Sequence, residues 1–356
     1  MTYSPPTSNS QPVSPYRGNP AKTYWKSAVQ GSQITEIENL YVKKFPISPK
    51  QRIATAGSCF AQHISRHLRR NGYSVLDVEP APPHLDGASA AEYGYGIYSA
   101  RFGNIYYTRQ LMQLAREVLE QKTPGEIVWE RGGRYFDALR PSIVPNGHDS
   151  PAAVLAHRAA HLKSVKKLFA MTDIFVFTMG LTEAWELIED GTIFPTAPGT
   201  VAGSFDPEKY QFKNFNYDEI VRDFLEFRIL LRRINPNVKF MITVSPVPLA
   251  ATATSNHVLT ATTYSKSVLR AAAGEIERRC ADVDYFPSYE IVTTNFLPNH
   301  AFDATGRGVL PQTVNQVMSY FFNQHPIEKR VKEESLEAAA AEAVYCEEAL
   351  LEVFAV

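Results

Sequence analysis

The sequence has few of the features that tie a protein to metals, disulfides or membranes. Its 356 residues include only three cysteines, at positions 59, 280 and 346, which are too few and too scattered for a disulfide framework or a zinc site. No segment approaches the ~18–20 continuous apolar residues that span a bilayer. The formal net charge of -1 argues against nucleic acid or an anionic membrane as a partner. We therefore expect a soluble, cytoplasmic protein without a metal or other cofactor.

Three common catalytic signatures are also missing. The sequence has no G-x-S-x-G nucleophile elbow, no G-x-x-x-x-G-K-[ST] phosphate loop and no H-E-x-x-H zinc motif. Catalysis, if this chain performs it, must use another pattern of residues.

The composition is that of an ordinary globular protein, with 44% hydrophobic and 21% charged residues. Residues 1–20 are rich in Ser, Pro and Asn and predict a mobile N-terminal tail. Residues 21–325 predict one α/β domain. Residues 326–356 differ in composition and predict a helix rich in Ala and Glu, with Leu336, Ala340, Ala343, Leu350 and Phe354 on one face. Such a helix docks either on the body or on a second copy of the chain, which would give a homo-oligomer.

Strand patterns and helix patterns alternate through the central part of the chain. The strand patterns are "RIATAGS" (52–58), "DIFVFTMG" (173–180), "VKFMITVSP" (238–246) and, more weakly, "DVDYFPS" (282–288). Helical patterns follow at residues 60–70, 109–121, 152–171, 217–237 and 265–283. Alternation of this kind predicts a mainly parallel sheet with helices on both faces. Residues 190–217 lack a clear period and predict a long loop that covers a site or a partner surface.

Distinctive polar stretches follow the predicted strands. "GSCFA" (57–61), "GLTEAW" (180–185) and "SPVPLAATA" (245–253) each come after a strand, and "RFGNIYY" (101–107) holds a Gly-Asn pair. Ligands of a doubly wound sheet bind beyond the carboxyl ends of its strands. This placement favours a site there, although any α/β protein also has turns at these ends.

Ser58 is the best candidate for a nucleophile. It stands between a strand and a helix, where the helix N-terminus stabilises negative charge on the serine or on a bound oxyanion. The alternative is that Ser58 only caps the helix. Cys59 has two interpretations as well, a thiol whose pKa the helix N-terminus lowers, or a small buried filler.

The base for such a serine is harder to find among the nine histidines. His157 and His161 are spaced i, i+4, which without a third ligand is more typical of a solvated helix face than of a metal site. His257 follows the third strand on the expected side of the sheet, and His300 lies in a late loop with Asp303 nearby. We consider His257 and His300 the candidate bases.

Several longer stretches together resemble the GSCFA family, which is similar to the SGNH (GDSL-like) hydrolases. They are "IATAGSCFAQHI", "YSARFGNIYYTRQL", "FTMGLTEAW", "ITVSPVPLAATAT", "TYSKSVLRAAAGEI" and "YFPSYEIV", preceded by "SPYRGNPAKTYWKSAV" near the start. The resemblance covers about residues 14–322. It implies a flavodoxin-like, three-layer α/β/α fold with a mainly parallel sheet.

The resemblance also implies roles for single residues. Ser58 takes the place of the SGNH nucleophile, and Gly103 and Asn104 lie near the second block, which helps to bind the oxyanion. Thr182 and Glu183 replace the usual Asn of the third block, although a carboxylate cannot donate as an amide does.

The last SGNH block, Asp-x-x-His, is where this sequence departs most. Thr305 takes the Asp position and Gly308 the His position. A shifted register brings in Asp303, but no histidine follows it before His325. Loss of the base from such a site removes several orders of magnitude of rate.

Three functions stay open. The first is an SGNH-like serine esterase or O-acyltransferase, with Ser58 attacking an acylated carbohydrate or a similar small ester. The second is a catalytically degenerate protein that binds a glycan or acyl ligand. The third is an assembly scaffold that uses the C-terminal helix as its contact.

Overall fold

The computed structural model describes residues 14–294, 301–327, 344 and 346–355. Its α-helices are α1 (Trp25–Ala28), α2 (Phe60–Arg70), α3 (Gly87–Glu92), α4 (Thr108–Glu120), α5 (Pro151–Met171), α6 (Tyr217–Ile234), α7 (Val258–Arg279), α8 (Ser288–Thr293) and α9 (Pro311–Gln324). Its strands are β1 (Ile53–Gly57), β2 (Val128–Arg131), β3 (Arg134–Asp137), β4 (Ile174–Met179), β5 (Glu183–Leu187), β6 (Ile193–Phe194), β7 (Tyr210–Asn214), β8 (Lys239–Val244) and β9 (Val283–Tyr285). The 3-10 helices of the described residues are η1 (Ala21–Thr23), η2 (Ile34–Glu36) and η3 (Glu347–Phe354).

The central sheet has the strand order β1-β4-β8-β9, and all its pairs are parallel. On the other side of β1, Val75 forms a parallel bridge with Ile53. The chain therefore leaves β1 toward Val75 and then returns past β1 to form β4, β8 and β9. This reversal is a topological switch point between β1 and β4, the place where open α/β sheets bind ligands.

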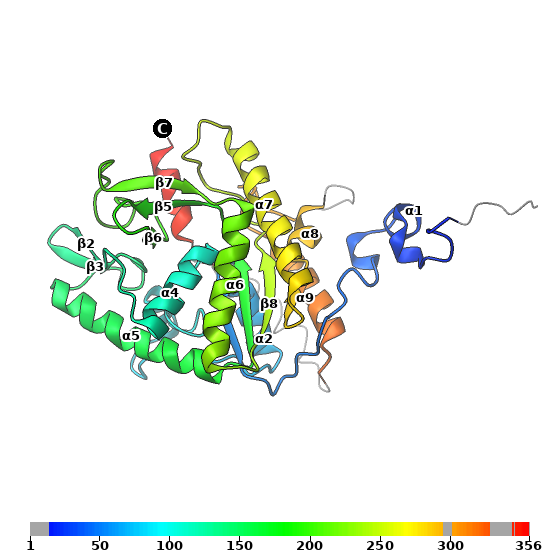
Figure 1. The fold of residues 1–356 in the computed structure, drawn as a ribbon, viewed down its shortest axis with the longest axis horizontal. Coiled ribbons are helices and arrows are strands. Elements are labelled where there is room, and N and C mark those ends of the chain that lie inside the picture. Colours follow the sequence, from blue (N-terminus) through cyan, green and yellow to red (C-terminus); the bar gives the residue numbers. More distant parts are fainter. Residues whose placement is uncertain (1–13, 295–300, 328–343, 345, 356) are drawn as a thin grey trace, which may run out of the picture.

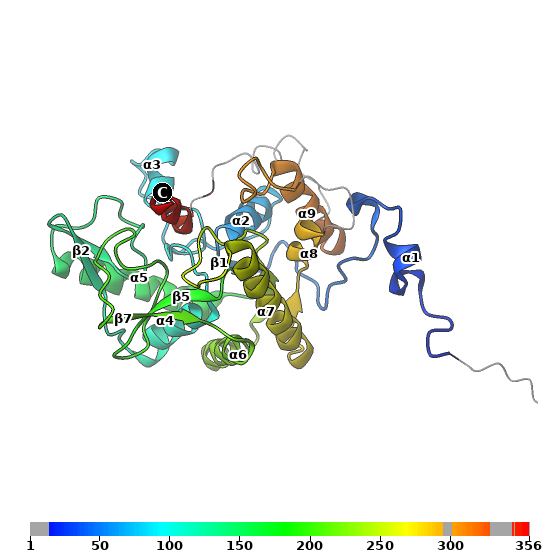
Figure 2. The same ribbon diagram turned by 90° about the horizontal axis from the view of Figure 1, so that it is seen from above.

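Helices cover both faces of this sheet, as the sequence predicts. Ala54, Phe175 and Phe240 belong to the core that contains residues of α4, α5, α6 and α7. The alternate strand residues Ile174 and Met241 belong to the core under α2, α8 and α9. Figure 1 shows α6 in front of the sheet, and the view from above in Figure 2 shows α2 and α9 on the other side. The three-layer α/β/α fold is confirmed.

The segment predicted as a long loop contains regular structure instead. β5 pairs antiparallel with both β6 and β7, and Trp185 lies opposite Phe194 on one neighbour and Phe212 on the other. These cross-strand aromatic contacts stabilise a small second sheet even though the sequence shows no period-2 pattern. A further antiparallel pair, β2 and β3, also was not predicted from the sequence.

The two ends of the chain behave differently. The N-terminal segment with η1 and α1 extends away from the body, and Tyr16 and Trp25 are exposed (Figure 1). At the other end, the predicted face positions 336, 340 and 343 lie outside the described residues. Within η3, Leu350 and Phe354 are exposed, whereas the side chain of Glu347 is buried. The described part of the tail therefore faces the body with a carboxylate rather than with its apolar stripe.

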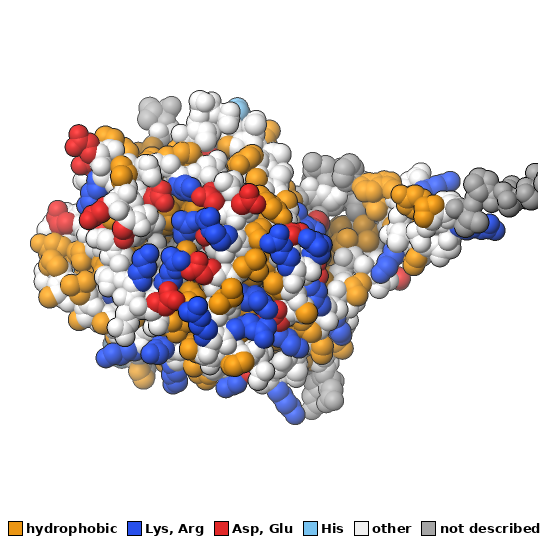
Figure 3. Space-filling model, viewed as in Figure 1, with side chains coloured by type: hydrophobic (Ala, Val, Ile, Leu, Met, Phe, Trp, Pro, Cys, Tyr) orange, Lys and Arg blue, Asp and Glu red, His pale blue; other side chains and the backbone are white. Residues whose placement is uncertain are grey.

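Charges of both signs are interspersed on the face that carries α6 and α7 (Figure 3). Several belong to ion pairs, such as Arg228 with Asp282 and Arg233 with Glu120. In the part of the chain that the structure describes, none of the helices combines the length and apolar character needed to cross a membrane.

Candidate active site

A tight corner between β1 and α2 holds Ser58 at the switch point. Gly57 has a φ of +145°, and a Cβ at this position would lie 2.7 Å from backbone atoms of Thr178 on β4. Only glycine permits this close approach. The backbone N–H of Ser58 then donates to the Thr178 carbonyl over 3.1 Å. The corner is therefore fixed to the strand beside it.

The Ser58 hydroxyl lies inside this corner without a partner. Ser58 is 2% exposed, and its Oγ makes no hydrogen bond to any described residue. The N-cap of α2 is Cys59, and no side chain caps this helix. The interpretation of Ser58 as a helix cap is therefore wrong.

Cys59 is a poor competitor of Ser58 for the role of nucleophile. Its thiol is buried and hydrogen-bonds Cys346 on the C-terminal segment. This bond, and next the burial of the sulfur, raise the pKa of Cys59 well above its usual value. These two effects outweigh any lowering of the pKa by the helix N-terminus, so Cys59 stays protonated.

A buried lysine, which the sequence reasoning missed, lies next to the corner. Lys266 on α7 is 1% exposed, and its Nζ donates to the Gly180 carbonyl over 2.6 Å. Gly180 packs directly on the serine, since a Cβ on Gly180 would lie 3.0 Å from Ser58 Cβ. Burial lowers the pKa of Lys266 to about 8, although the Glu348 carboxylate opposes this shift. The sequence signal that could have identified Lys266 is a lysine on the buried face of its helix.

Asn104 is connected to Ser58 through one tyrosine. The Tyr98 hydroxyl donates to the Ser58 carbonyl over 2.9 Å and also hydrogen-bonds Asn104 Oδ1. Asn104 is itself buried, in the loop that follows Gly103 and leads into α4. The structure therefore places Asn104 beside the serine corner.

The carboxylate of Glu347 fills the space in front of this loop. Glu347 is 1% exposed and accepts hydrogen bonds from Asn104 Nδ2, from the Tyr106 hydroxyl over 2.9 Å and from the Ser142 hydroxyl over 2.6 Å. No sequence pattern pointed to this contact, because residues 104 and 347 are far apart in the chain.

Glu348, the next residue, has a second buried carboxylate. It accepts from the backbone N–H of Ala250 over 3.0 Å and lies 3.6 Å from the Arg307 guanidinium. Burial raises the pKa of Glu348 to about 7. The C-terminal segment thus brings two acidic side chains to the carboxyl ends of the strands.

Thr182 and Glu183 lie at the neighbouring strand end. The Thr182 hydroxyl is buried and has no hydrogen-bond partner among the described residues, while its backbone N–H donates to Ser265 Oγ. The Glu183 carboxylate accepts from the Thr252 hydroxyl and from the Ala253 N–H, over 2.8 and 3.1 Å. Glu183 therefore attaches the small sheet to the loop after β8.

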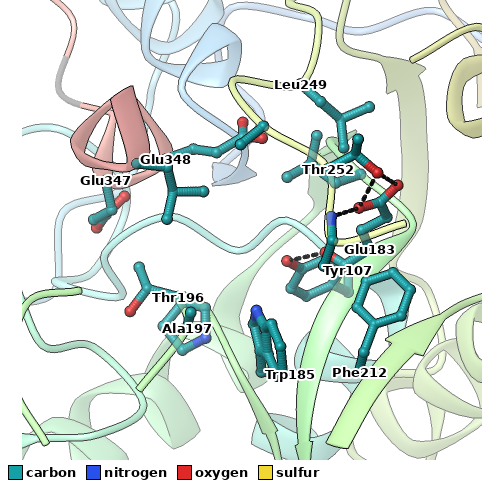
Figure 4. Close-up of a pocket in the computed structure, with 15 residues that line it drawn as sticks. Tyr107, Glu183, Trp185, Thr196, Ala197, Phe212, Leu249, Thr252, Glu347 and Glu348 are labelled. Atoms are coloured by element: carbon teal, nitrogen blue, oxygen red, sulfur yellow. Dashed lines mark hydrogen bonds between the residues drawn. The ribbon is translucent and has the colours of Figure 1, made fainter. Parts of the chain in front are cut away.

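A mainly apolar cavity of about 220 Å³ opens between these elements. Figure 4 shows Glu347 and Glu348 at one end of it and Glu183 with Thr252 at the other. The remaining wall residues include Tyr107, Leu181, Trp185, Phe212, Leu249 and Leu351.

The loop of residues 303–308 is folded around the Asp303 carboxylate. This carboxylate accepts from the Thr305 hydroxyl and backbone N–H and from the Gly308 N–H. A Cβ on Gly308 would lie 2.1 Å from Asp303 Oδ2. A side chain at position 308 would therefore displace the Asp303 carboxylate from these hydrogen bonds. A second cavity, of about 400 Å³, lies between Gly308, Cys59 and Cys346.

No described histidine hydrogen-bonds the Ser58 hydroxyl. His257 is exposed at the N-cap of α7, where its Nδ1 accepts from the Leu259 N–H, and no hydrogen bond joins it to Ser58. His300 lies outside the described residues. His325, the next histidine in the chain, is buried against Tyr41 and the backbone of Ile47.

His157 and His161 do not lie on a solvated helix face, and that expectation is wrong. His161 is 2% exposed and bonds Glu79, while His157 contacts the guanidinium groups of Arg101 and Arg140. Among the described residues, no group of three or more His, Cys, Asp and Glu side chains could hold a metal ion.

Comparison with known proteins gives one family. The family model described as "GSCFA family" matches residues 52–321, which include the serine corner, the Asn104 loop, Lys266 and Gly308. No curated protein matches the chain.

Proposed function

The chain belongs to the GSCFA family, and from this membership and the geometry at Ser58 we propose that it is a serine esterase or O-acyltransferase with an SGNH-like site. One observation carries the proposal: the Ser58 hydroxyl is buried at the switch point and has no hydrogen-bond partner among the described residues. A buried hydroxyl without a partner costs free energy, and folded proteins keep few of them. At a ligand-binding edge, such a hydroxyl is available for attack.

The proposed reaction has two steps. Ser58 Oγ bonds to the carbonyl carbon of an ester and gives its proton to a base, and the bond to the alcohol oxygen breaks as the proton passes to the leaving alcohol. Water then attacks the acyl-serine in an esterase, or a hydroxyl of a second molecule attacks in a transferase. Both routes return Ser58 with its proton.

Lys266 is the base in this proposal, in place of His257 and His300. Its Nζ bonds the carbonyl of Gly180, and Gly180 packs on Ser58, so this buried amine lies next to the serine corner. With a pKa of about 8, lowered by burial, a fraction of the amine is unprotonated at neutral pH.

Thr182 is the proposed donor to the oxyanion. The N–H of Ser58 is already used by the Thr178 carbonyl. The Thr182 hydroxyl, by contrast, is buried and has no partner among the described residues. It also stands at the position that the SGNH resemblance assigns to a donating Asn, and a hydroxyl donates as that amide does.

The proposed substrate is an acylated carbohydrate or a similar small ester. A cavity of about 220 Å³ suits a small group, and Trp185, Phe212 and Tyr107 give it aromatic walls. We also propose a cytoplasmic location, because Cys59, Cys280 and Cys346 are all free thiols.

The test is covalent labelling with a fluorophosphonate, followed by mass spectrometry to locate the adduct. We expect one adduct, on Ser58, and none in Ser58→Ala. Lys266→Met should slow labelling and remove its rise with pH near 8, whereas His257→Ala should label like the wild type. A folded wild-type protein that never labels at Ser58 would contradict the proposal.

A second candidate is a protein that binds the ester without turnover. The loop at Asp303 and Gly308 favours it, because a glycine stands where the SGNH resemblance places the histidine and the Asp303 carboxylate fills the space beside it. This candidate predicts that affinity for an acylated sugar survives Ser58→Ala and that no acyl-serine forms.

A further inference from the structure

Several side chains of the body donate hydrogen bonds to the carboxylate of Glu347. Three neutral donors, from Asn104, Tyr106 and Ser142, converge on its two carboxylate oxygens. Ser142 Oγ donates to one oxygen, and Asn104 and Tyr106 donate to the other. Among the described residues, no Lys, Arg or His forms an ion pair with Glu347, so hydrogen bonds offset the cost of burying its charge.

The donors are held in place by groups other than Glu347. Asn104 Oδ1 bonds Tyr98, and the Asn104 carbonyl accepts from the Gln110 side chain over 3.0 Å. The same Gln110 side chain accepts from the Tyr106 N–H over 3.0 Å. The loop that carries two of the three donors is therefore preorganised for a carboxylate, whatever molecule supplies it.

The segment that supplies Glu347 is held mainly by polar contacts. Besides Glu347, it is attached through Glu348 to the Ala250 N–H and through Glu352 to Arg307. Val353 is 79% exposed, so much of the apolar surface of η3 makes no contact with the body. Such a segment exchanges with a ligand more easily than one buried by an apolar face.

We propose that Asn104, Tyr106 and Ser142 form a carboxylate-binding subsite next to Ser58, and that Glu347 occupies it as a built-in competitor of carboxylate ligands. Glu347 also lines the 220 Å³ cavity, so its departure joins the subsite to that cavity. The neutral donors suit a single negative charge better than the two charges of a phosphate monoester. The link to catalysis rests on the proposed function: the ester, or the acceptor alcohol, would carry a carboxylate.

The experiment uses acetate as the probe, with acetamide as its neutral match. In Glu347→Ala the subsite is vacated, so acetate should bind, measured by calorimetry and as a rise of several degrees in Tm, while acetamide should not. Wild type and Val353→Ala, which alters an exposed residue of the same segment, should show no such rise. The double variant Ser142→Ala/Glu347→Ala should bind acetate about tenfold more weakly, because one hydrogen bond to the charge is lost.

Three results would overturn the proposal. One is a folded Glu347→Ala variant that does not bind acetate, and another is a wild type that binds acetate equally well. The third is an unchanged affinity when Ser142 is also replaced. If Glu347→Ala fails to fold, Glu347→Gln replaces it, because the amide cannot accept from all three donors and should also yield to acetate.

The outcome is separable from that of the proposed function. The double variant Ser58→Ala/Glu347→Ala has no nucleophile but should still bind acetate. If Ser58 never labels while Glu347→Ala binds acetate, the esterase proposal fails and the subsite stands. If Ser58 labels but Glu347→Ala does not bind acetate, the subsite proposal fails and the esterase proposal stands.

Discussion

Two buried polar regions of this molecule differ in whether their polar groups have interaction partners. In the cluster of Arg158, Arg140, Asp137 and Glu117, every charged group has a partner of opposite sign. Burial raises the pKa of Asp137, but the charges of Arg158 and Arg140 outweigh this effect and hold the pKa at about 2. At the serine corner and the neighbouring strand end, Ser58 and Thr182 keep buried hydroxyls without partners among the described residues.

This difference indicates that the arginine cluster stabilises the fold, whereas the serine corner is a candidate site. The arginine cluster joins α4, β3 and α5, and its satisfied charges stabilise one arrangement of these elements. The serine corner is held by its backbone through Gly57 and Thr178, so its side chains are left available. Unpaired buried groups that persist at a ligand-binding edge indicate a site.

The largest expected effect is on activity at the serine corner. Ser58→Ala should lower ester turnover by at least about 10³-fold, because it removes the nucleophile. Turnover of a chromogenic ester by the purified variant measures this. Ser99→Ala is the matched control, a buried serine whose Oγ accepts from the Thr55 N–H over 2.9 Å, and it should keep turnover within about twofold of wild type. Residual turnover above one tenth in Ser58→Ala would count against Ser58.

In the arginine cluster the large effect should be on stability. Asp137→Asn leaves Arg140 and Arg158 short of a buried counter-charge and should lower the free energy of unfolding by about 3–5 kcal/mol, measured in urea. Asp173→Asn breaks the exposed pair with Arg52 and should cost less than about 1 kcal/mol. Equal costs for the two variants would remove the distinction between the cluster and a surface pair.

A third effect concerns pH and His67. Burial, followed by repulsion from Arg70, lowers the pKa of His67 to about 4. In the unfolded chain His67 takes up a proton near pH 6.5, whereas in the folded chain it stays neutral until about pH 4. The free energy of unfolding therefore decreases as the pH falls from about 6.5 toward 4. Between pH 7.5 and pH 5, His67→Leu should lose about 2 kcal/mol less unfolding free energy than wild type. Identical losses in urea titrations at both pH values would contradict this assignment.

The smallest effect is also the sharpest test of the comparison. Ser58→Ala should change the free energy of unfolding by less than about 0.5 kcal/mol, since the Oγ makes no hydrogen bond within the described chain. Ser99→Ala should lose about 1 kcal/mol with its hydrogen bond to Thr55. A larger loss in Ser58→Ala than in Ser99→Ala would mean that the Ser58 hydroxyl has a structural partner.

The sheet could be predicted because its strands are local patterns. The apolar runs at residues 173–180 and 238–246 form β4 and β8, and the helical pattern at residues 60–70 forms α2. β5, β6 and β7 could not be predicted in this way, because their pairing depends on aromatic contacts between strands rather than on alternation within each strand. Ser58 could be singled out from its position at a strand end.

The sequence by itself determined the order of the central strands and of the helices between them, the corner at Gly57 and Ser58, and the lack of a histidine at position 308. Short-range periodicity and glycine geometry are sufficient for these features. Only the tertiary structure decided that Lys266 lies next to Gly180, that Cys59 is held by Cys346 and that Glu347 fills the space beside Asn104. Burial and long-range contact set the charge and availability of these groups, and no local pattern carries that information.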